Sequence, residues 1–357
     1  MTYTNISHDQ IKNLQYRYHM VGSYYVFDLD FLDRAMEDWK TLFPTIKPYY
    51  AVKCNPHPLI IERLVQLGAG FDCASQAEIE LVHSKGSNDI LFANPCKIPS
   101  DLKGAHELGV SVTTFDSVSE IEKISKYPMK VILRIRADDP TARCQLGNKY
   151  GAEEFEWDEL FISAKTYKLD LVGISFHVGS GARNEAAYVD GVKKALRAAK
   201  RSMDFGFDPK IIDIGGGFTH GKIPTELSRC LIDYLDGFDV IAEPGRYFAE
   251  KVAHLFTPVI GYKHNSVTIE ESLYGAFNCR LFDHAEPQPI FQDERPKTKK
   301  TLFGCTCDGI DVIYNEIDLP DLSIGDLIQW PNMGAYTMAA TTAFNGIPFY
   351  KRKIFQS

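Results

Sequence analysis

Residues 48–74 read PYYAVKCNPHPLIIERLVQLGAGFDCA, and this stretch contains the unit from which the fold is built. It begins with a short, apolar, β-rich run, PYYAVK, and ends with a second such run, FDCA. Between them, PLIIERLVQLG repeats its apolar residues every three to four positions, which is typical of an amphipathic helix. The stretch therefore predicts a strand, a helix and a second strand.

The same alternation continues to about residue 245. Eight β-rich runs occur in all: PYYAVK (48–53), FDCA (71–74), DILFA (89–93), VTTF (112–115), KVILRIR (130–136), LVGISFHV (171–178), KIIDIG (210–215) and DVIAEPG (239–245). Eight buried strands, each followed by a helix, favour an α/β fold with a closed (β/α)8 barrel. An open doubly wound sheet is the weaker alternative.

The alternation of strand-like and helix-like patterns ends at about residue 252. Segments such as LFTPVIGYKH, SVTIEES and DLIQWPNMGAYTMAA read as strands separated by turns, with no long helical pattern. They predict a second, mainly β domain. Near the start of the chain, YYVFDLD at 24–30 precedes the first barrel strand and could pair with it. Two domains also suit 357 residues, since a domain takes roughly 150.

Composition excludes several classes of protein. Hydrophobic residues make up 45% and charged residues 24%, as in ordinary globular proteins, and the net charge of −8 argues against nucleic acid or an anionic membrane as the main partner. The N-terminus lacks the apolar core of a signal peptide, and no run is long enough to span a membrane. The eight scattered cysteines resemble neither a disulfide framework nor a zinc site. We expect a cytoplasmic protein with reduced thiols and no metal.

Unusual polar residues fall where barrel strands end, which is where barrel enzymes place their catalytic groups. Lys53 closes the apolar run YYAVK, and burial there would lower its pKa and make it a nucleophile able to form a Schiff base. The structural alternative is a lysine that reaches from the barrel edge into water. Asp72 and Arg134 end two other strands.

Three further segments suggest a phosphate and an aromatic ring. The run Gly215-Gly216-Gly217 could bring backbone N–H groups to a phosphate, or it could simply make a turn. In SFHVGSG, Ser180 is a second candidate phosphate contact and His177 could cover a ring, although a single His is more often a core residue. In EPGR, Glu243 could charge a ring nitrogen and Arg246 could meet phosphate, or the two could form a plain ion pair.

Pyridoxal 5′-phosphate (PLP) is the cofactor that this combination of residues indicates best: a lysine, a phosphate-binding loop, a histidine that stacks on a ring, and a carboxylate.

The order of short motifs along the chain resembles that of a known family. The segments YYAVKCNP, FDCASQAEIE, FANPCK, TTFDSVSEI, LRIRADD, FHVGSG, DIGGGF, AEPGRYF, FNCRLFDHAEPQP, CDGID and MGAYTMAATTAFNG occur in the same order as in eukaryotic-type ornithine decarboxylases. The chain thus resembles the PLP decarboxylases with the alanine-racemase-like fold, from about residue 22 to residue 346.

The resemblance implies a PLP-binding barrel at 28–252 and a β domain formed by 1–27 and 253–357. It implies that Lys53 binds PLP covalently, that Glu243 pairs with the pyridine nitrogen and that His177 stacks on the ring. The other cofactor-binding residues would be Asp72, Arg134, Ser180, Gly216, Gly217, Gly245, Arg246 and Tyr336.

For the substrate, the resemblance implies a homodimer in which the CDGID segment of one subunit completes the site of the other. Cys307 would protonate the carbanion left by CO2. Asp308 and Asp283 would bind the distal amine of ornithine, and Tyr274 and Phe344 would also contact substrate. The structural alternatives are a buried apolar cysteine for Cys307 and a helix N-cap for Asp283.

Rival activities share this fold. Diaminopimelate decarboxylases carry a C-E-S-x-D type segment in place of CDGID and are disfavoured. Viral-type arginine decarboxylases are harder to exclude, and lysine differs from ornithine by one methylene, worth only about 1–3 kcal/mol. The segment between Asp283 and Cys307 is short, which bears on specificity. A non-catalytic protein of the antizyme-inhibitor type is disfavoured because the cofactor residues are present. Since the chain stops at Ser357, degradation through a long C-terminal tail is not expected.

Overall fold

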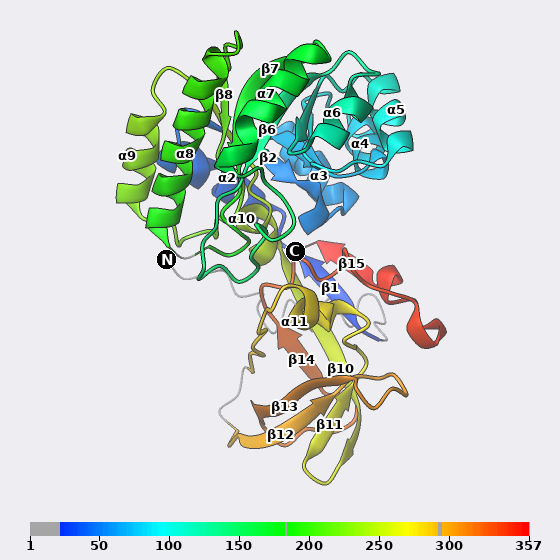
Figure 1. The fold of residues 1–357 in the computed structure, drawn as a ribbon. Coiled ribbons are helices and arrows are strands. Elements are labelled where there is room, and N and C mark those ends of the chain that lie inside the picture. Colours follow the sequence, from blue (N-terminus) through cyan, green and yellow to red (C-terminus); the bar gives the residue numbers. More distant parts are fainter. Residues whose placement is uncertain (1–21, 183, 292–294, 357) are drawn as a thin grey trace. The chain divides into compact units, whose positions relative to one another are not determined.

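The computed structural model describes residues 22–182, 184–291 and 295–356. The chain divides into two compact units (Figure 1). One runs from Asp30 to Ala249, and the other combines the described residues up to Leu29 with those from Glu250 on. Residues 1–21, which the resemblance assigns to the β domain, lie outside the described part of the chain.

The unit from Asp30 to Ala249 is a closed barrel of eight parallel strands in chain order, as the sequence predicts. The strands are β2 (Ile46–Ala51), β3 (Gly70–Cys73), β4 (Ile90–Phe92), β5 (Val112–Phe115), β6 (Lys130–Ile135), β7 (Asp170–Phe176), β8 (Ile211–Asp213) and β9 (Asp239–Ala242). Strand β9 pairs with β2 and closes the barrel, so the open sheet is excluded.

Helices cover the outside of this barrel (Figure 1). They are α2 (Asp30–Leu42), α3 (Pro58–Gln66), α4 (Gln76–Ser84), α5 (Pro99–Glu107), α6 (Val118–Ile124), α7 (Trp157–Thr166), α8 (Glu185–Met203), α9 (Thr225–Tyr234) and the short α10 (Arg246–Ala249). Local signals fix where they begin. Ser75 caps α4 by accepting a hydrogen bond from the Glu78 N–H at 3.3 Å, and the Glu78 carboxylate accepts one from the Ala74 N–H at 2.6 Å.

Several strands end sooner than their apolar runs predict. Strand β2 stops at Ala51, and Lys53 lies in a single 3-10 turn, Val52–Cys54. Strand β7 stops at Phe176 and β9 at Ala242, so His177 and Glu243 follow their strands directly. The chain leaves the barrel wall at these points, which frees the next residues to project over the carboxyl edge.

An aromatic cluster supports this part of the barrel. Trp39 of α2 is fully buried, and its ring centroid lies 5.5 Å from that of Phe218 and 5.0 Å from that of Tyr247. Phe218 follows the glycine run and Tyr247 follows Arg246. The cluster therefore ties helix α2 to the two segments that carry the candidate phosphate contacts.

The other unit is built on a seven-stranded sheet in the order β13-β12-β11-β10-β1-β15, with β14 paired to β10. Its strands are β1 (Tyr24–Phe27), β10 (Ala253–Lys263), β11 (Ser266–Ile269), β12 (Thr298–Phe303), β13 (Val312–Leu319), β14 (Leu327–Trp330) and β15 (Lys353–Gln356). Strand β1 pairs with β10 and β15, so both ends of the chain enter this sheet, as the resemblance implies. The expectation that residues 24–30 pair with the first barrel strand is wrong.

The helices of the described ranges are all too short or too polar to cross a membrane. All eight cysteines lie in these ranges and are thiols.

Candidate active site

Side chains from six barrel segments interact at the carboxyl edge of the barrel. Lys53 forms an ion pair with Asp72, whose carboxylate is fully buried. The Lys53 side chain itself is 43% exposed, so the expectation of a buried, desolvated lysine is wrong for this chain taken alone. Its position in a 3-10 turn beyond β2, rather than inside the strand, accounts for the exposure. The amine is therefore held by a buried anion and remains open to a reaction partner.

His177 is half-buried, and its imidazole is electrically neutral. Burial lowers the pKa of its imidazole well below the usual range, and the positive charges of Arg134 and Lys53 lower it further. Its Nδ1 accepts a hydrogen bond from the Gly179 N–H at 2.9 Å, which fixes the ring plane. A Cβ added to Gly216 would lie 3.0 Å from His177 Nε2, so the imidazole lies against the glycine run.

Two acidic residues, half-buried Glu243 and fully buried Asp213, lie beside this histidine. Burial raises the pKa of the Glu243 carboxyl well above its usual range, and the Asp213 and Asp72 carboxylates raise it further. Burial also raises the pKa of Asp213, which accepts a hydrogen bond from the Gly215 N–H at 2.8 Å. Asp72 Oδ1 is buried and has no hydrogen-bond partner among the described residues. This crowding of carboxylates favours a cation placed among them.

Sequence reasoning missed Asp213. A signal was available, because Asp213 is an acidic residue in the apolar run KIIDIG, just before the glycines. A charged residue in a buried strand needs a partner or a function. Its burial beside Glu243 makes it part of the same acidic group.

The glycine run is shaped for close approach by a ligand. Gly217 has a φ of +98°, and a Cβ there would lie 2.6 Å from the Gly179 carbonyl oxygen and 2.7 Å from Tyr188 Oη. The Tyr188 hydroxyl donates a hydrogen bond to the Gly216 carbonyl at 3.1 Å and so steadies the run. A larger residue would displace this backbone, which is a common requirement of phosphate loops.

Two side chains face each other near this run. Arg246 Nη2 donates a hydrogen bond to Ser180 Oγ at 3.0 Å, and Arg246 is only 4% exposed. Neighbouring Gly245 packs so closely on the Lys53 turn that a Cβ would lie 2.9 Å from Cys54 Cβ. A buried guanidinium with a hydroxyl beside it suits an anion such as phosphate.

The predicted substrate residues lie in the other unit, and three of them meet. The Tyr274 hydroxyl donates a hydrogen bond to Asp308 Oδ2 at 2.5 Å, and the Tyr274 and Phe344 rings stack with centroids 4.1 Å apart. The Tyr274 hydrogen bond and one from the Ile310 N–H lower the pKa of Asp308. Asp308 therefore presents an ionised carboxylate beside an aromatic surface.

The remaining predicted residues of this unit lie on neighbouring segments. Cys307 is exposed, so the alternative of a buried apolar cysteine is wrong, and its N–H donates to Asn345 Oδ1 at 3.1 Å. Asp283 is buried and follows α11 (Cys279–Phe282), which makes the N-cap alternative wrong. Tyr336 adopts a φ of +54°, a conformation that is uncommon for a non-glycine residue and clusters at functional sites.

Comparison with known proteins decides the family. The family model of the pyridoxal-dependent decarboxylases, pyridoxal binding domain, matches residues 29–250, which is most of the chain. The chain belongs to this family.

The relatives of this chain carry different names. The chain is 40% identical over 351 residues to a chloroplastic ornithine decarboxylase of Nicotiana glauca, and the match covers 90% of this chain and 81% of the relative. It is also 37% identical over 359 residues to antizyme inhibitor 2 of Xenopus laevis, covering 91% of this chain and 79% of the relative.

Solved structures confirm the fold. The arginine decarboxylase of Paramecium bursaria Chlorella virus, bound to agmatine, matches with a TM-score of 0.92 and 38% identity, covering 98% of this chain and 100% of that one. A lysine decarboxylase of Selenomonas ruminantium matches with a TM-score of 0.91 and 30% identity, covering 99% and 97%.

PLP is the cofactor of this decarboxylase domain, and the barrel edge fits it. The clustered carboxyl groups of Glu243, Asp213 and Asp72 suit a protonated ring nitrogen, because a cation placed among them would relieve their mutual repulsion. The narrow space at Gly217 and the buried Arg246 suit a phosphate.

Proposed function

We propose that this decarboxylase converts L-ornithine to putrescine and CO2, a step of polyamine biosynthesis. The observation that carries the proposal is the Asp308 carboxylate, held ionised by Tyr274 beside the exposed Cys307. A short carboxylate suits the primary ammonium at the end of a three-carbon side chain. The 40% identity to an ornithine decarboxylase supports the same substrate.

In the proposed mechanism, Lys53 would hold the cofactor through its side-chain amine. Glu243 pairs with the ring nitrogen, supported by Asp72 and Arg134, and neutral His177 stacks on the ring. When bound, PLP delocalises the electron pair that stays on Cα as the Cα–carboxylate bond breaks. Contacts to the phosphate and its surroundings come from Ser180, Gly216, Gly217, Gly245, Arg246 and Tyr336.

The other unit supplies the substrate contacts in this proposal. Asp308 and Asp283 bind the distal ammonium, and the Tyr274 and Phe344 rings flank the aliphatic chain. Cys307 donates its thiol proton to Cα after CO2 has left, so the diamine forms with one proton replacing one carboxylate. Loss of the carboxylate charge is favoured where the site excludes water.

We further propose that the active enzyme is a homodimer in which Lys53 and Cys307 of each site come from different subunits. Both side chains are exposed within a single chain, which suits groups that a second chain covers.

The test of the dimer combines a Lys53→Ala chain with a Cys307→Ala chain, with tagged subunits to verify exchange. Random pairing makes half the dimers mixed, each with one intact site of two, so about a quarter of wild-type activity returns. If mixed dimers form and activity stays at the level of the separate variants, the two residues act within one chain.

Arginine is the second candidate substrate, because the viral arginine decarboxylase matches this chain over its whole length. Lysine is a third, since it is one methylene longer than ornithine. Steady-state CO2 release from ornithine, lysine, arginine and diaminopimelate decides among them, and a preference for arginine would refute the ornithine assignment while leaving PLP chemistry intact.

A non-catalytic role like that of the antizyme inhibitor relative is the alternative of another class. Its signature would be a folded chain that neither retains PLP nor releases CO2 from any of the four amino acids. The exposed Lys53 amine and the buried acidic group argue against it, since both serve a bound cofactor. Borohydride reduction followed by mass spectrometry of the intact chain detects the cofactor directly, without an activity assay.

A further inference from the structure

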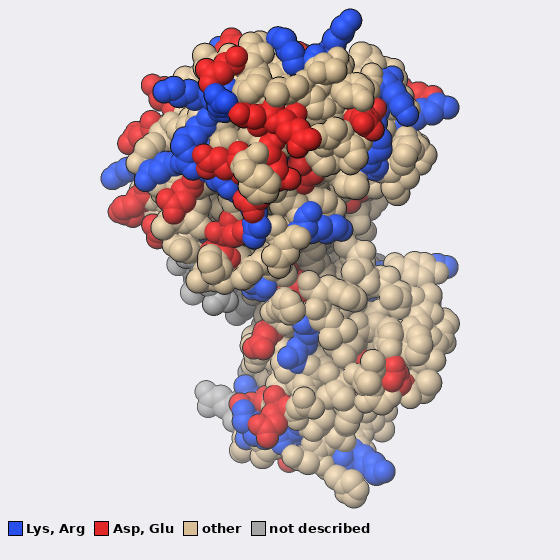
Figure 2. Space-filling model, in the orientation of Figure 1, with Lys and Arg blue, Asp and Glu red and all other residues tan. Residues whose placement is uncertain are grey.

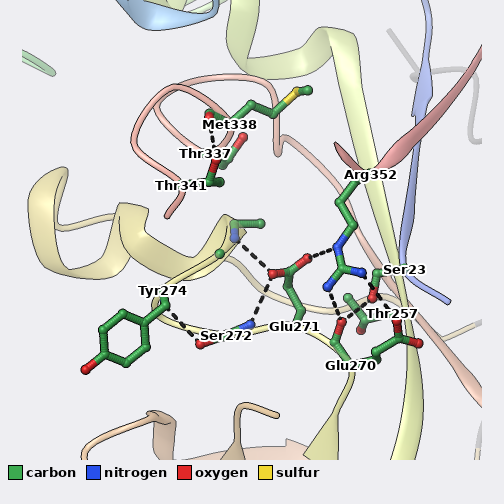
Figure 3. Close-up of polar contacts among 12 residues, drawn as sticks. Ser23, Thr257, Glu270, Glu271, Ser272, Tyr274, Thr337, Met338, Thr341 and Arg352 are labelled. Carbon is green, nitrogen blue, oxygen red and sulfur yellow. Dashed lines mark hydrogen bonds and ion pairs between the residues drawn. The ribbon is translucent and has the colours of Figure 1, made fainter. Parts of the chain in front are cut away.

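A buried carboxylate accepts hydrogen bonds from the backbone of the turn that carries Tyr274. Glu271 is fully buried, and its Oε1 accepts hydrogen bonds from the N–H groups of Ser272 at 3.2 Å and Ala276 at 3.1 Å (Figure 3). These two amides lie at either end of a short loop with Tyr274 in its middle. One side chain therefore closes the loop on itself.

A second buried carboxylate holds the same loop through other donors. Asp311 Oδ2 accepts a hydrogen bond from Ser272 Oγ at 2.8 Å, and Asp311 Oδ1 accepts one from the Leu273 N–H at 2.9 Å. Ser272 Oγ in turn accepts a hydrogen bond from the Tyr274 N–H at 2.9 Å (Figure 3). The backbone that carries Tyr274 is thus fixed by side chains on both sides.

The charge of Glu271 is balanced by Arg352, near the end of the chain. Arg352 Nε lies 3.0 Å from Glu271 Oε2, and Nη2 donates a hydrogen bond to the Glu270 carbonyl at 2.8 Å (Figure 3). The Arg352 side chain is only 12% exposed. Ser23 Oγ donates to the same Glu270 carbonyl at 2.5 Å, so residues from both ends of the chain converge on this point.

Residues 342–344 of the C-terminal segment also contact this loop, through Tyr274. The Thr342 N–H donates a hydrogen bond to the Tyr274 carbonyl at 2.9 Å, and the Phe344 ring stacks on the Tyr274 ring. Residues 342–352 are therefore anchored to one loop at both ends. Movement of Arg352 would be transmitted to Phe344 and to the Tyr274 hydroxyl that contacts Asp308.

We infer that the Glu271–Arg352 ion pair is a positioning element that holds Tyr274 and Phe344 in place for recognition of the substrate's distal end. The inference rests on the proposed substrate role of Asp308 and Tyr274. We assign neither Glu271 nor Arg352 a contact with the substrate. They act only through the loop and the C-terminal segment.

The physical reason is the cost of an unpaired buried charge. Burial raises the pKa of Glu271 to about 7, although Arg352 and the two N–H donors oppose the rise. Without Arg352 the carboxyl becomes protonated or gains a new partner. In either case its grip on the Ser272 and Ala276 amides weakens.

The test is Arg352→Met in the full-length protein, with Arg352→Lys as the conservative variant. We expect Arg352→Met to raise the KM of the preferred amino acid by about tenfold, with kcat changed less than about threefold. The Kd for PLP stays at the wild-type value, because the barrel residues proposed to hold PLP lie in the other unit of the chain. Arg352→Lys keeps the charge but not the planar fork, and its KM falls between the two.

Two matched controls separate positioning from general destabilisation. Lys299→Met breaks an exposed ion pair with Asp318 in the same unit, at 2.9 Å. Leu319→Ala opens a cavity at the end of strand β13 that lies farther from Asp311, away from the loop. Both controls keep the wild-type KM, and Leu319→Ala lowers the unfolding midpoint.

Three outcomes would each overturn the inference: an unchanged KM in Arg352→Met, an equal rise of KM in Leu319→Ala, or loss of PLP from Arg352→Met. If Arg352→Met does not fold, Arg352→Lys decides by the same criteria. If the wild type turns over none of the amino acids, the proposed function fails. Calorimetric titration with putrescine, cadaverine and agmatine then tests the loop directly: equal affinity for wild type and variant, or binding of none to the wild type, overturns the inference.

Discussion

Replacing Gly217 by alanine separates cofactor binding from fold stability, and the chain offers a matched control. Gly237 also has a positive φ, +88° against +98° for Gly217, but a Cβ there meets nothing within 4 Å. It precedes β9 and so lies at the amino end of the barrel, away from the candidate active site. Alanine in the left-handed region costs roughly 1–2 kcal/mol at either position.

At Gly217 the added Cβ has a second cost. It would lie 2.6 Å from the Gly179 carbonyl oxygen and 2.7 Å from Tyr188 Oη. Both distances are shorter than a Cβ atom can approach another heavy atom without a steric clash. The backbone of the run must move, and its N–H groups move with it. We expect the affinity for PLP to fall by about 10- to 100-fold, which corresponds to about 1.4–2.8 kcal/mol.

The assay is titration of each apoprotein with PLP, followed by cofactor absorbance, together with thermal unfolding of the same samples. Both variants should lose stability, Gly217→Ala more than Gly237→Ala because of the added steric clash, and only Gly217→Ala should lose affinity for PLP. Equal PLP affinity in Gly217→Ala and Gly237→Ala would show that the glycine run does not hold the phosphate.

Three other variants test separate parts of the molecule. Lys53→Ala should abolish covalent attachment of PLP, so borohydride reduction should add no cofactor mass to the chain, and decarboxylation should fall by several orders of magnitude; a reduced adduct at wild-type yield would contradict this. Lys97 is buried, and its Nζ lies 2.9 Å from the Glu120 carboxylate. Lys97→Met should therefore lower the free energy of unfolding by about 3 kcal/mol. Burial lowers the pKa of Lys97 to about 8, so the folded protein binds fewer protons than the unfolded chain between pH 8 and 10.5. The free energy of unfolding of the wild type, relative to that of Lys97→Met, should therefore rise by about 1–3 kcal/mol across that window. Urea unfolding of both proteins at the two limits of the window measures this difference, and a constant or falling difference would contradict the prediction. Asp308→Ala should lower kcat/KM for ornithine by about tenfold or more, whereas Asp321→Ala, at an exposed carboxylate of the same unit, should not.

Local sequence was enough to predict the barrel. Alternating apolar runs and amphipathic segments identified all eight strands, because a strand buried on both faces and a helix buried on one leave periodic patterns in the chain itself. The pairing of residues 24–27 could not be read in this way. Strand β1 joins β10 and β15, and partners so distant in sequence leave no local signal.

The position of the candidate site also followed from sequence. In a barrel the carboxyl ends of all strands share one edge, so the order of strands alone places Lys53, His177, Glu243 and the glycine run together. The residue types then indicate PLP. The substrate is less determined, because similar side chains serve ornithine, lysine and arginine in relatives of the same fold.

Burial and charge pairing were decided only by the tertiary structure. Lys53 reads as a buried lysine, but the strand ends two residues earlier and leaves its side chain 43% exposed. Asp213 reads as an ordinary strand residue, but it is buried against Glu243. Glu271 and Arg352 lie 81 positions apart and still form one ion pair. A pKa and an ion pair depend on the distance to other charges and on exclusion of water, and both are properties of the folded chain rather than of any local segment.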